Sequence, residues 1–332
     1  HSCAIEPDLA KKISQLLLGS FQNLQVLGEC DTALGQLYAK TVRALLAKAN
    51  IQEKVVAIGC HGQTILHQPE HILPFTQQIG DPSWLSLETG IDVVTDFRRA
   101  NLVLGGQGAP FAPAFHKQLF AEAGRTIWVL NMGGIANLSI LAKAPLAETL
   151  GFDVGPANAL LDVWAASHQR GPYDAEGRWG KSGTMIPTLL ASMLEDPYFA
   201  AQPPKSSGRE YFSKAWLDAH LMPDQRPEDV QATLSNLLPS LLRQQYLQAK
   251  EKPEKLFICG GGVYNSFVVE LLEQALPCPV QDSLLKGYPP MAIEAMCFAW
   301  LAKCRIERKP VDLRSVTGAR SASVLGGVYS GC

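Results

Sequence analysis

The stretch 255–276, "KLFICGGGVYNSFVVELLEQAL", decides the fold class. A short apolar run ends at three consecutive glycines, and apolar residues at helical spacing follow, which predicts a buried strand, a tight turn and an amphipathic helix. The stretch 125–141, "RTIWVLNMGGIANLSIL", shows the same strand and glycine turn and then returns as a second β-like run. Strands that alternate with helices predict an α/β fold, in which functional loops follow the ends of strands.

The alternation continues outside these two stretches. Asp31 precedes apolar residues at helical spacing, so we expect it to be the N-cap of a helix. Short β-branched runs that end at glycine or at charged residues are typical of buried strands. We expect helices over 7–21, 30–50 and 289–304, and strands over 55–58 and 91–98.

The composition of the 332 residues is that of a globular protein. Hydrophobic residues make up 47% and charged residues 18%, which is enough apolar matter for a sizeable core. The net charge is −2 and Lys/Arg clusters are short, which argues against a nucleic-acid or anionic-membrane partner, because both need a basic patch. We see no run of roughly 18 apolar residues that would span a membrane, and no signal peptide.

The eight cysteines include no CxxC pair, and several lie within apolar runs. This pattern favours buried, reduced thiols over a disulfide framework or a zinc site. Because reduced thiols are typical of the cytosol, we expect a cytoplasmic protein. No other spacing of metal-ligating residues is visible, so we expect no metal site made by side chains.

Two glycine turns, "NMGGIAN" at 131–137 and "CGGGVYN" at 259–265, each follow a predicted strand and close on an asparagine. Glycine lets the backbone approach a phosphate closely, and a helix after the second turn adds its N-terminal dipole. Packing within tight turns is the alternative, but the repetition favours nucleotide binding. Neither turn matches a Walker loop or GxGxxG, which argues against a dinucleotide-dependent oxidoreductase. The candidate nucleotide-binding residues are Asn131, Gly133, Gly134, Asn137, Gly260, Gly261, Gly262 and Asn265.

The stretch 151–162, "GFDVGPANALLD", places Asp153 before a Gly-Pro pair and an apolar, helix-like run. A carboxylate at a strand end, beside the start of a helix, can take a proton from water or a hydroxyl. The spacing fits equally well an aspartate that caps the following helix. We therefore consider Asp153 both as a candidate catalytic base and as a candidate cap.

Polar side chains follow two other predicted strands. "CHGQT" at 60–64 supplies His61, Gln63 and Thr64, which suit hydrogen bonding to a polyhydroxylated ligand, although a lone histidine is more often structural. In "TDFRRANLVLGGQGAP", Arg98 has the fork geometry that binds a carboxylate in two places. The alternative for this stretch is an ion pair between Asp96 and an arginine.

Two further groups of charged residues remain. Glu294 lies in an otherwise apolar helical run, so we expect a buried hydrogen-bond acceptor or a ligand contact there. Lys205 and Arg209 lie in "PPKSSGREYF", a proline-led loop that we interpret as surface structure or a lid rather than as a source of catalytic groups.

Taken together, the blocks resemble one family. They are "GCHGQT", "QIGD", "DFRRANLVLGGQGAPFAPAFH", "LNMGGIANLS", "GFDVGPANALLD", "KSSGRE" followed by "YFSKAWL", "CGGGVYN" and "SVTGARSASVLGG". In this order and at these distances, from about residue 30 to the end, they resemble anhydro-N-acetylmuramic acid kinases.

The resemblance implies a fold and a reaction. The fold is the two-lobed α/β fold of the sugar kinase/Hsp70/actin superfamily, with a central interlobe cleft, and the lobes would comprise 1–124 plus about 310–332, and 125–309. The reaction opens the 1,6-anhydro ring of 1,6-anhydro-N-acetylmuramic acid with water and phosphorylates O6 with ATP and Mg²⁺, during recycling of cell-wall peptidoglycan. The partners implied are the amino sugar and ATP, and, because the family tends to dimerise, a second copy of the chain.

The resemblance also implies roles for single residues. Asp153 matches the family's catalytic base, Arg98 a substrate-binding arginine suited to the lactyl carboxylate, and Glu294 a substrate-contacting glutamate. The first glycine turn would face the phosphates and Gly260–Gly262 the nucleoside.

The chain departs from the family pattern in two places. Ala157 stands where the family usually has glycine, which is tolerable unless the position needs a positive φ. The family also begins with a β-hairpin that carries a "GTSLDGVD"-like phosphate loop, and the sequence as given does not contain it. Because that loop supplies donors to the transferred group, we expect the chain as given to be a poor kinase. A catalytically silent protein that binds sugar or nucleotide is the alternative function.

Overall fold

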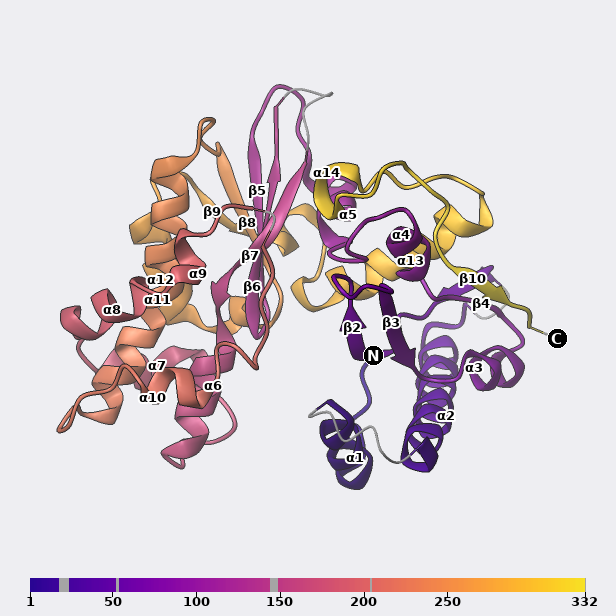
Figure 1. The fold of residues 1–332 in the computed structure, drawn as a ribbon, viewed down its shortest axis with the longest axis horizontal. Helices are drawn as coiled ribbons and strands as arrows, with labels where there is room; N and C mark the ends of the chain where they lie inside the picture. The colour runs from indigo at the N-terminus through magenta and orange to yellow at the C-terminus, as the bar shows by residue number, and fades with distance from the viewer. Residues whose placement is uncertain (18–23, 52–53, 144–148, 204, 332) are drawn as a thin grey trace. The chain divides into compact units, whose positions relative to one another are not determined.

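The computed structural model describes residues 1–332 except 18–23, 52–53, 144–148, 204 and 332. The chain forms two compact units, which we describe separately: unit 1 comprises His1–Phe111 and Ala295–Cys332, and unit 2 comprises Ala112–Glu294. The domain bounds expected from the sequence, 124/125 and 309/310, lie further along the chain and stay a prediction. Both units combine helices and sheet, which confirms the α/β fold class (Figure 1).

Unit 2 is built on a five-stranded sheet with the strand order β7-β6-β5-β8-β9. Strand β6 is antiparallel to its neighbours β5 and β7, whereas β8 runs parallel to β5 and β9 parallel to β8. The central strands β5 and β8 are buried almost throughout, as expected inside an α/β sheet. The strands are β5 (Ile127–Met132), β6 (Ile135–Leu141), β7 (Leu150–Pro156), β8 (Lys255–Cys259) and β9 (Val280–Asp282).

The helices of unit 2 bury the sheet in one hydrophobic core. The long helix α11 packs on α12, α6, α7, α8 and strand β7, and most of its first sixteen residues are buried. Fully buried Trp128, Leu138 and Leu272 join the sheet to these helices. The helices are α5 (Ala112–Phe120), α6 (Asn158–Ser167), α7 (Arg178–Ser182), α8 (Pro187–Leu194), α9 (Pro197–Ala200), α10 (Lys214–Asp218), α11 (Pro227–Gln248) and α12 (Ser266–Ala275).

Unit 1 contains a three-stranded sheet with the order β1-β4-β10 and a separate hairpin, β2–β3. Strand β4 is parallel to β1 and antiparallel to the C-terminal β10. The strands are β1 (Ala57–Gly59), β2 (Gln63–Gln68), β3 (Phe75–Ile79), β4 (Asp92–Thr95) and β10 (Gly327–Tyr329). The helices are α1 (Pro7–Leu17), α2 (Leu24–Ala49), α3 (Pro82–Thr89), α4 (Arg99–Val103), α14 (Arg314–Thr317) and most of α13 (Ile293–Ile306).

The local predictions differ from the structure at a few elements of unit 1. Helix α2 begins at Leu24, so Asp31 lies inside it and is not its N-cap. The Asp31 carboxylate instead accepts a hydrogen bond from the Gly80 N–H at 2.6 Å. The strand expected over 55–58 is shifted to Ala57–Gly59, and the end of the helix expected over 7–21 lies outside the described residues.

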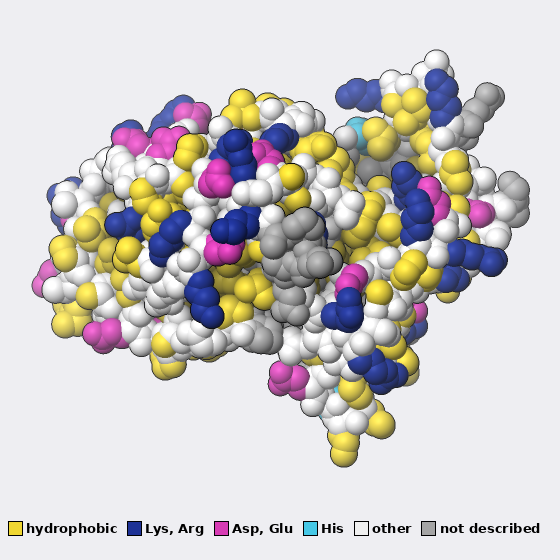
Figure 2. Space-filling view, turned by 90° about the horizontal axis from the view of Figure 1, so that it is seen from above, with side chains coloured by type: hydrophobic (Ala, Val, Ile, Leu, Met, Phe, Trp, Pro, Cys, Tyr) yellow, Lys and Arg dark blue, Asp and Glu magenta, His cyan; other side chains and the backbone are white. Residues whose placement is uncertain are grey.

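The surface carries mixed charges. On the face shown in Figure 2, Lys and Arg side chains are interspersed with Asp and Glu side chains and with apolar groups. Among the helices that the structure describes, none has both the length and the apolar character needed to cross a membrane.

Candidate active site

Asp153 owes its position to a bulge between β6 and β7. The antiparallel register pairs Ala136 with Gly155. The next pair is Asn137 with Asp153, so β7 has one extra residue at this point. Gly155 has φ +156°, and a Cβ there would lie 2.8 Å from a phenylalanine ring carbon, so backbone and packing both favour glycine. The bulge places the Asn137 and Asp153 side chains opposite each other on one face of the sheet.

Neutral donors bind both oxygens of the Asp153 carboxylate. One oxygen accepts from the Asn137 side-chain amide, and the other accepts from the Ser207 backbone N–H at 2.8 Å. The backbone of Asp153 is also bound: its N–H donates to the Lys205 carbonyl at 3.1 Å, and its carbonyl accepts from the Tyr198 hydroxyl at 2.8 Å. The segment 205–207 therefore covers β7, the outer strand of the sheet.

Burial raises the pKa of Asp153 to about 6. The Ser207 N–H, the Asn137 amide and the charge of Lys205 oppose this rise, because each stabilises the ionised carboxylate. The Lys205 ammonium donates to two backbone carbonyls, at 3.1 and 3.3 Å, rather than to the carboxylate. Asp153 is therefore ionised at neutral pH and is a stronger base than an exposed aspartate.

Asp153 does not cap the helix that follows it, so that interpretation is wrong. Strand β7 runs past Asp153, and the N-cap position of α6 is taken by Ala157. The first N–H groups of α6 donate to the carbonyls of Gly133 and Gly134, at 2.9 to 3.1 Å. Ala157 has φ −115°, so its methyl group meets no left-handed backbone and the departure from the family's glycine is tolerated.

A pocket of about 450 Å³ lies in unit 2 beside the second glycine turn, a volume typical of small-molecule sites. Two of the candidate nucleotide residues, Gly261 and Asn265, line it. Asn158 from α6 lines it as well and donates to the Gly133 carbonyl at 2.8 Å, which connects the first glycine turn to the pocket wall. The pocket is further lined by Asp162, Tyr173 and Asp174.

Packing explains part of the second glycine turn. Gly260 has φ +80°, and a Cβ at Gly262 would lie 2.5 Å from the Met132 Cβ, so both positions need glycine for the turn itself. Around Gly261 the nearest atom to an added Cβ is a methionine sulfur at 3.8 Å, which leaves its backbone open to the pocket. Asn131 lies on β5 beside Gly260, behind the turn.

The carboxylates at the pocket differ in their partners. Asp174 accepts from the backbone N–H groups of Trp179 at 2.9 Å and Gly180 at 2.8 Å, so it shapes the loop that it begins. Burial raises the pKa of Asp162, and the charge of Arg209 opposes that rise. Sequence reasoning assigned no role to either carboxylate, because nothing local distinguishes them from surface aspartates.

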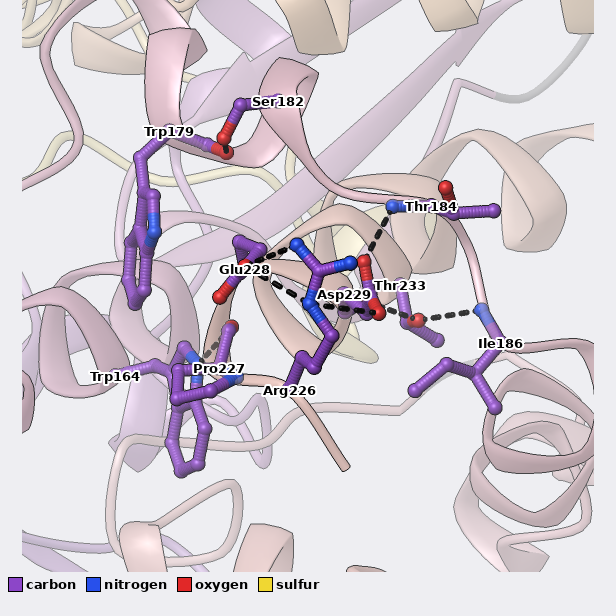
Figure 3. A network of polar contacts seen from close by, with 10 residues as sticks. All are labelled: Trp164, Trp179, Ser182, Thr184, Ile186, Arg226, Pro227, Glu228, Asp229 and Thr233. Atoms are coloured by element: carbon purple, nitrogen blue, oxygen red, sulfur yellow. Dashed lines mark hydrogen bonds and ion pairs between the residues drawn. The ribbon is translucent and has the colours of Figure 1, made fainter. Parts of the chain in front are cut away.

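The start of α11 fixes the helix that carries Asn158 and Asp162. The Trp164 indole on α6 donates to the Pro227 carbonyl at 2.8 Å. In the same network Asp229 accepts from the Thr184 N–H at 2.7 Å and the Thr233 hydroxyl accepts from the Ile186 N–H at 2.9 Å (Figure 3). One helix end thus binds both α6 and the segment 184–186, and it keeps one wall of the pocket in place.

Unit 1 contains a polar cluster of its own around Arg98. Its guanidinium donates to the His61 Nε2 from Nε at 3.0 Å, and to the Gly108 carbonyl from Nη1 at 2.7 Å. It lies 5.0 Å from the centre of the Phe111 ring, while Phe298 packs on His61 with ring centres 4.5 Å apart. Arg98 is therefore oriented from two sides by contacts that the sequence does not reveal.

His61 acts in this cluster as a neutral acceptor. Burial, together with the nearby Arg98 charge, lowers its pKa to about 4, so the imidazole is uncharged at neutral pH. Because Nε2 accepts from Arg98, the ring proton lies on Nδ1. The Asp96 carboxylate pairs with Arg99 at 3.4 Å, so the predicted ion pair is present but does not involve Arg98.

The remaining candidates lie where the sequence did not place them. Gln63 and Thr64 begin the hairpin β2–β3, where the Gln63 amide donates to the Thr64 carbonyl at 2.9 Å and the Thr64 hydroxyl accepts from Gln78 at 3.1 Å. Glu294 is exposed in the first turn of α13, so the expected buried acceptor is wrong. Its contact with a ligand stays a prediction.

The segment 205–209 has a role that the sequence does not reveal. Its residues are exposed or half-buried, as expected of surface structure, and in addition the Lys205 carbonyl and the Ser207 N–H bind the N–H and the carboxylate of Asp153. No side-chain pattern could have shown this, since the donor at Ser207 is a backbone N–H. A carboxylate so held, in a unit that also contains a pocket of about 450 Å³, is typical of an enzyme that acts on a small molecule.

Comparison with known proteins identifies the family. The model of the family described as "Anhydro-N-acetylmuramic acid kinase" matches residues 1–331, and the chain belongs to this family. An anhydro-N-acetylmuramic acid kinase of Coxiella burnetii (strain Dugway 5J108-111) is 43% identical over 334 residues, covering 100% of this chain and 90% of the relative. One of Sulfurovum sp. (strain NBC37-1) is 45% identical, covering 97% of this chain and 88% of the relative.

Proposed function

We propose that the protein opens the 1,6-anhydro ring of 1,6-anhydro-N-acetylmuramic acid and phosphorylates O6 at the expense of ATP. The observation that carries the proposal, together with the family, is Asp153: a half-buried carboxylate with a raised pKa, bound by neutral donors alone. A base of this kind suits proton removal from water at neutral pH.

The bonds change in the following way. Asp153 takes a proton from a water molecule, whose oxygen bonds to C1 of the sugar as the C1–O6 bond breaks. O6 then takes the γ-phosphoryl group of ATP, and ADP leaves. The products are N-acetylmuramic acid 6-phosphate and ADP, and the proton on Asp153 returns to solvent. Phosphoryl transfer needs little covalent help from a protein, so position and charge neutralisation supply the rest.

Other residues would position the two substrates. Arg98, held by His61 and Gly108, suits the lactyl carboxylate because a guanidinium binds carboxylates through two parallel hydrogen bonds. The pocket beside Gly261 would receive the nucleoside of ATP. Mg²⁺ would come with the phosphates and neutralise their charge, since the described residues include no cluster of three side chains that could hold a metal by themselves.

The experiment that tests the proposal follows both products. The protein is incubated with ATP and the anhydro-sugar, ADP release is coupled to an absorbance change, and the sugar is identified by mass spectrometry. Equal amounts of ADP and of a ring-opened 6-phosphate support the proposal. A phosphorylated sugar that keeps its anhydro ring, or ADP release independent of the sugar, contradicts it.

The alternative function, binding without turnover, gains no support: the family and the relatives named above are kinases. Calorimetric binding of sugar and ATP with no ADP formed over hours would establish it against the kinase.

A further inference from the structure

The guanidinium of Arg209 lies directly on the first glycine turn. A Cβ added to Gly134 would lie 2.5 Å from Nε, 2.8 Å from Nη2 and 3.0 Å from Cζ of Arg209. Only glycine allows a side chain to approach the backbone this closely. The turn that we expect to face the phosphates is therefore covered by a cation from a segment more than 70 residues further along the chain.

Arg209 forms no ion pair with any carboxylate among the described residues. Among the described residues none accepts a hydrogen bond from its guanidinium or forms an ion pair with it, and the residue is exposed. Asp162, which lines the pocket, senses the charge of Arg209 without bonding to it. An arginine in this state has donors free for a ligand beside Gly134.

We propose that Arg209 binds the terminal phosphoryl group of ATP beside the Gly133–Gly134 turn and stabilises its charge during transfer. The proposal rests on the function proposed above and adds a residue to it. Guanidinium suits this task because it is permanently charged and presents a planar fork of N–H groups to phosphate oxygens.

The same short segment also serves the base. The Ser207 N–H binds the Asp153 carboxylate at 2.8 Å, and Arg209 follows two residues later on the glycine turn. The segment 205–209 thus fixes the base and the charge-stabilising cation relative to each other. Because Asp153 and the phosphoryl group must act on the two ends of one breaking C1–O6 bond, a shared support keeps their spacing constant.

Nucleotide affinity tests the proposal without relying on turnover. ATP and ADP dissociation constants are measured by calorimetry for the wild type and for Arg209→Gln. We expect ATP to bind about tenfold more weakly and ADP to bind as before, because only ATP carries the terminal group. In parallel kcat should fall about 10²–10³-fold, the size found for one lost charge-stabilising donor. Arg243→Gln is the matched control: it removes an exposed arginine of α11 in the same unit and should change neither quantity.

A second variant checks the geometry. Gly134→Ala places a methyl group where the guanidinium lies, and a flexible side-chain end can move away without unfolding the chain. It should reproduce the selective loss of ATP affinity, and Arg209→Lys should restore part of it. Equal weakening of ATP and ADP, or unchanged ATP affinity and kcat in Arg209→Gln, overturns the role of Arg209. If the wild type forms no sugar phosphate at all, the function proposed above fails instead.

Discussion

Two carboxylates of unit 2, Asp153 and Glu122, both accept hydrogen bonds from several donors, yet their pKa values are shifted in opposite directions. Glu122 accepts from the ammonium groups of Lys286 at 2.8 Å and Lys255 at 3.3 Å and pairs with Arg125 at 3.1 Å. These lysines lower the pKa of Glu122 to about 2, whereas burial raises the pKa of Asp153 to about 6.

The difference lies in the burial of the carboxyl group and in the charge of its donors. Cations stabilise the ionised form of a carboxylate strongly and so lower its pKa. An amide and a backbone N–H orient the carboxylate and lower its pKa less, so a buried carboxylate can still accept a proton near neutral pH. The comparison teaches that the number of hydrogen bonds does not tell a structural carboxylate from a basic one. The burial of the carboxylate and the charge of its partners distinguish the two.

The largest expected effect comes from removing the base. Asp153→Asn keeps the size of the side chain and cannot take a proton, so kcat should fall about 10³-fold. Product formation is measured by the coupled ADP assay, and a thermal melt checks that the variant is folded. Glu122→Gln, the same change at the other carboxylate, should stay within twofold of the wild type. A comparable loss of kcat in both variants would show that Asp153 and Glu122 do not differ in their role.

Asn137→Ala tests the neutral donor. The wild-type kcat/KM should rise with pH up to about 6 and then level off, because Asp153 must be ionised. The Asn137 amide stabilises the ionised form of Asp153, so its removal raises the pKa of Asp153 further. The acidic limb, the part of the profile in which kcat/KM rises with pH, then moves to higher pH. At pH 7 we expect a loss of about tenfold or less. Asn236→Ala, which removes an amide bound to a carbonyl within α11, should leave the limb in place.

Lys205→Met tests the effect of a nearby cation on the pKa of Asp153. The Lys205 charge lowers the pKa of Asp153 without bonding to the carboxylate, so its removal should also move the acidic limb upward, by less than Asn137→Ala does. The pH dependence of kcat/KM measures this, with Lys214→Met, at an exposed pair of α10, as control. A downward shift would show that Lys205 does not act as a charge on Asp153.

The smallest expected effect is on stability. The folded-state pKa of Glu122 is depressed, so its contribution is present above the unfolded pKa of about 4.3 and is lost as pH falls toward 2. Since its partners are partly exposed, Glu122→Gln should lower the free energy of unfolding by about 1 kcal/mol or less at pH 7. Urea titrations at pH 7 and pH 2.5 measure this, and the difference between variant and wild type should shrink at the lower pH.

The sequence predicted the elements whose signals are local. The strand–glycine–strand of β5 and β6 and the strand–turn–helix of β8 and α12 follow from periodicity and glycine alone, and the structure confirms them. The hairpin β2–β3 was not predicted, because its strands, "QTILHQ" and "FTQQI", lack a clear apolar alternation. The start of α2 was placed too late, since Asp31 has the chemistry of a cap without its position.

The site was predictable only in its residue types. Asp153 and Arg98 could be proposed as a base and a carboxylate ligand, yet their partners lie far away in the sequence: Ser207 binds Asp153 from 54 residues away and His61 binds Arg98 from 37. The bulge at Gly155 that aims Asp153 depends on the register of two strands, which no single segment encodes. The orientation of the site is thus a tertiary property.

The docking of the segment 205–207 on β7 is thermodynamically linked to the protonation of Asp153. Because the Ser207 N–H binds the ionised form of Asp153 better than the protonated form, each proton taken up by Asp153 weakens the docking of 205–207. Undocking in turn raises the proton affinity of Asp153 by the same free energy. Hydrogen exchange at the Asp153 amide, which donates to the Lys205 carbonyl, should therefore quicken as the pH falls below about 6, relative to buried amides of β5, beyond the intrinsic pH dependence.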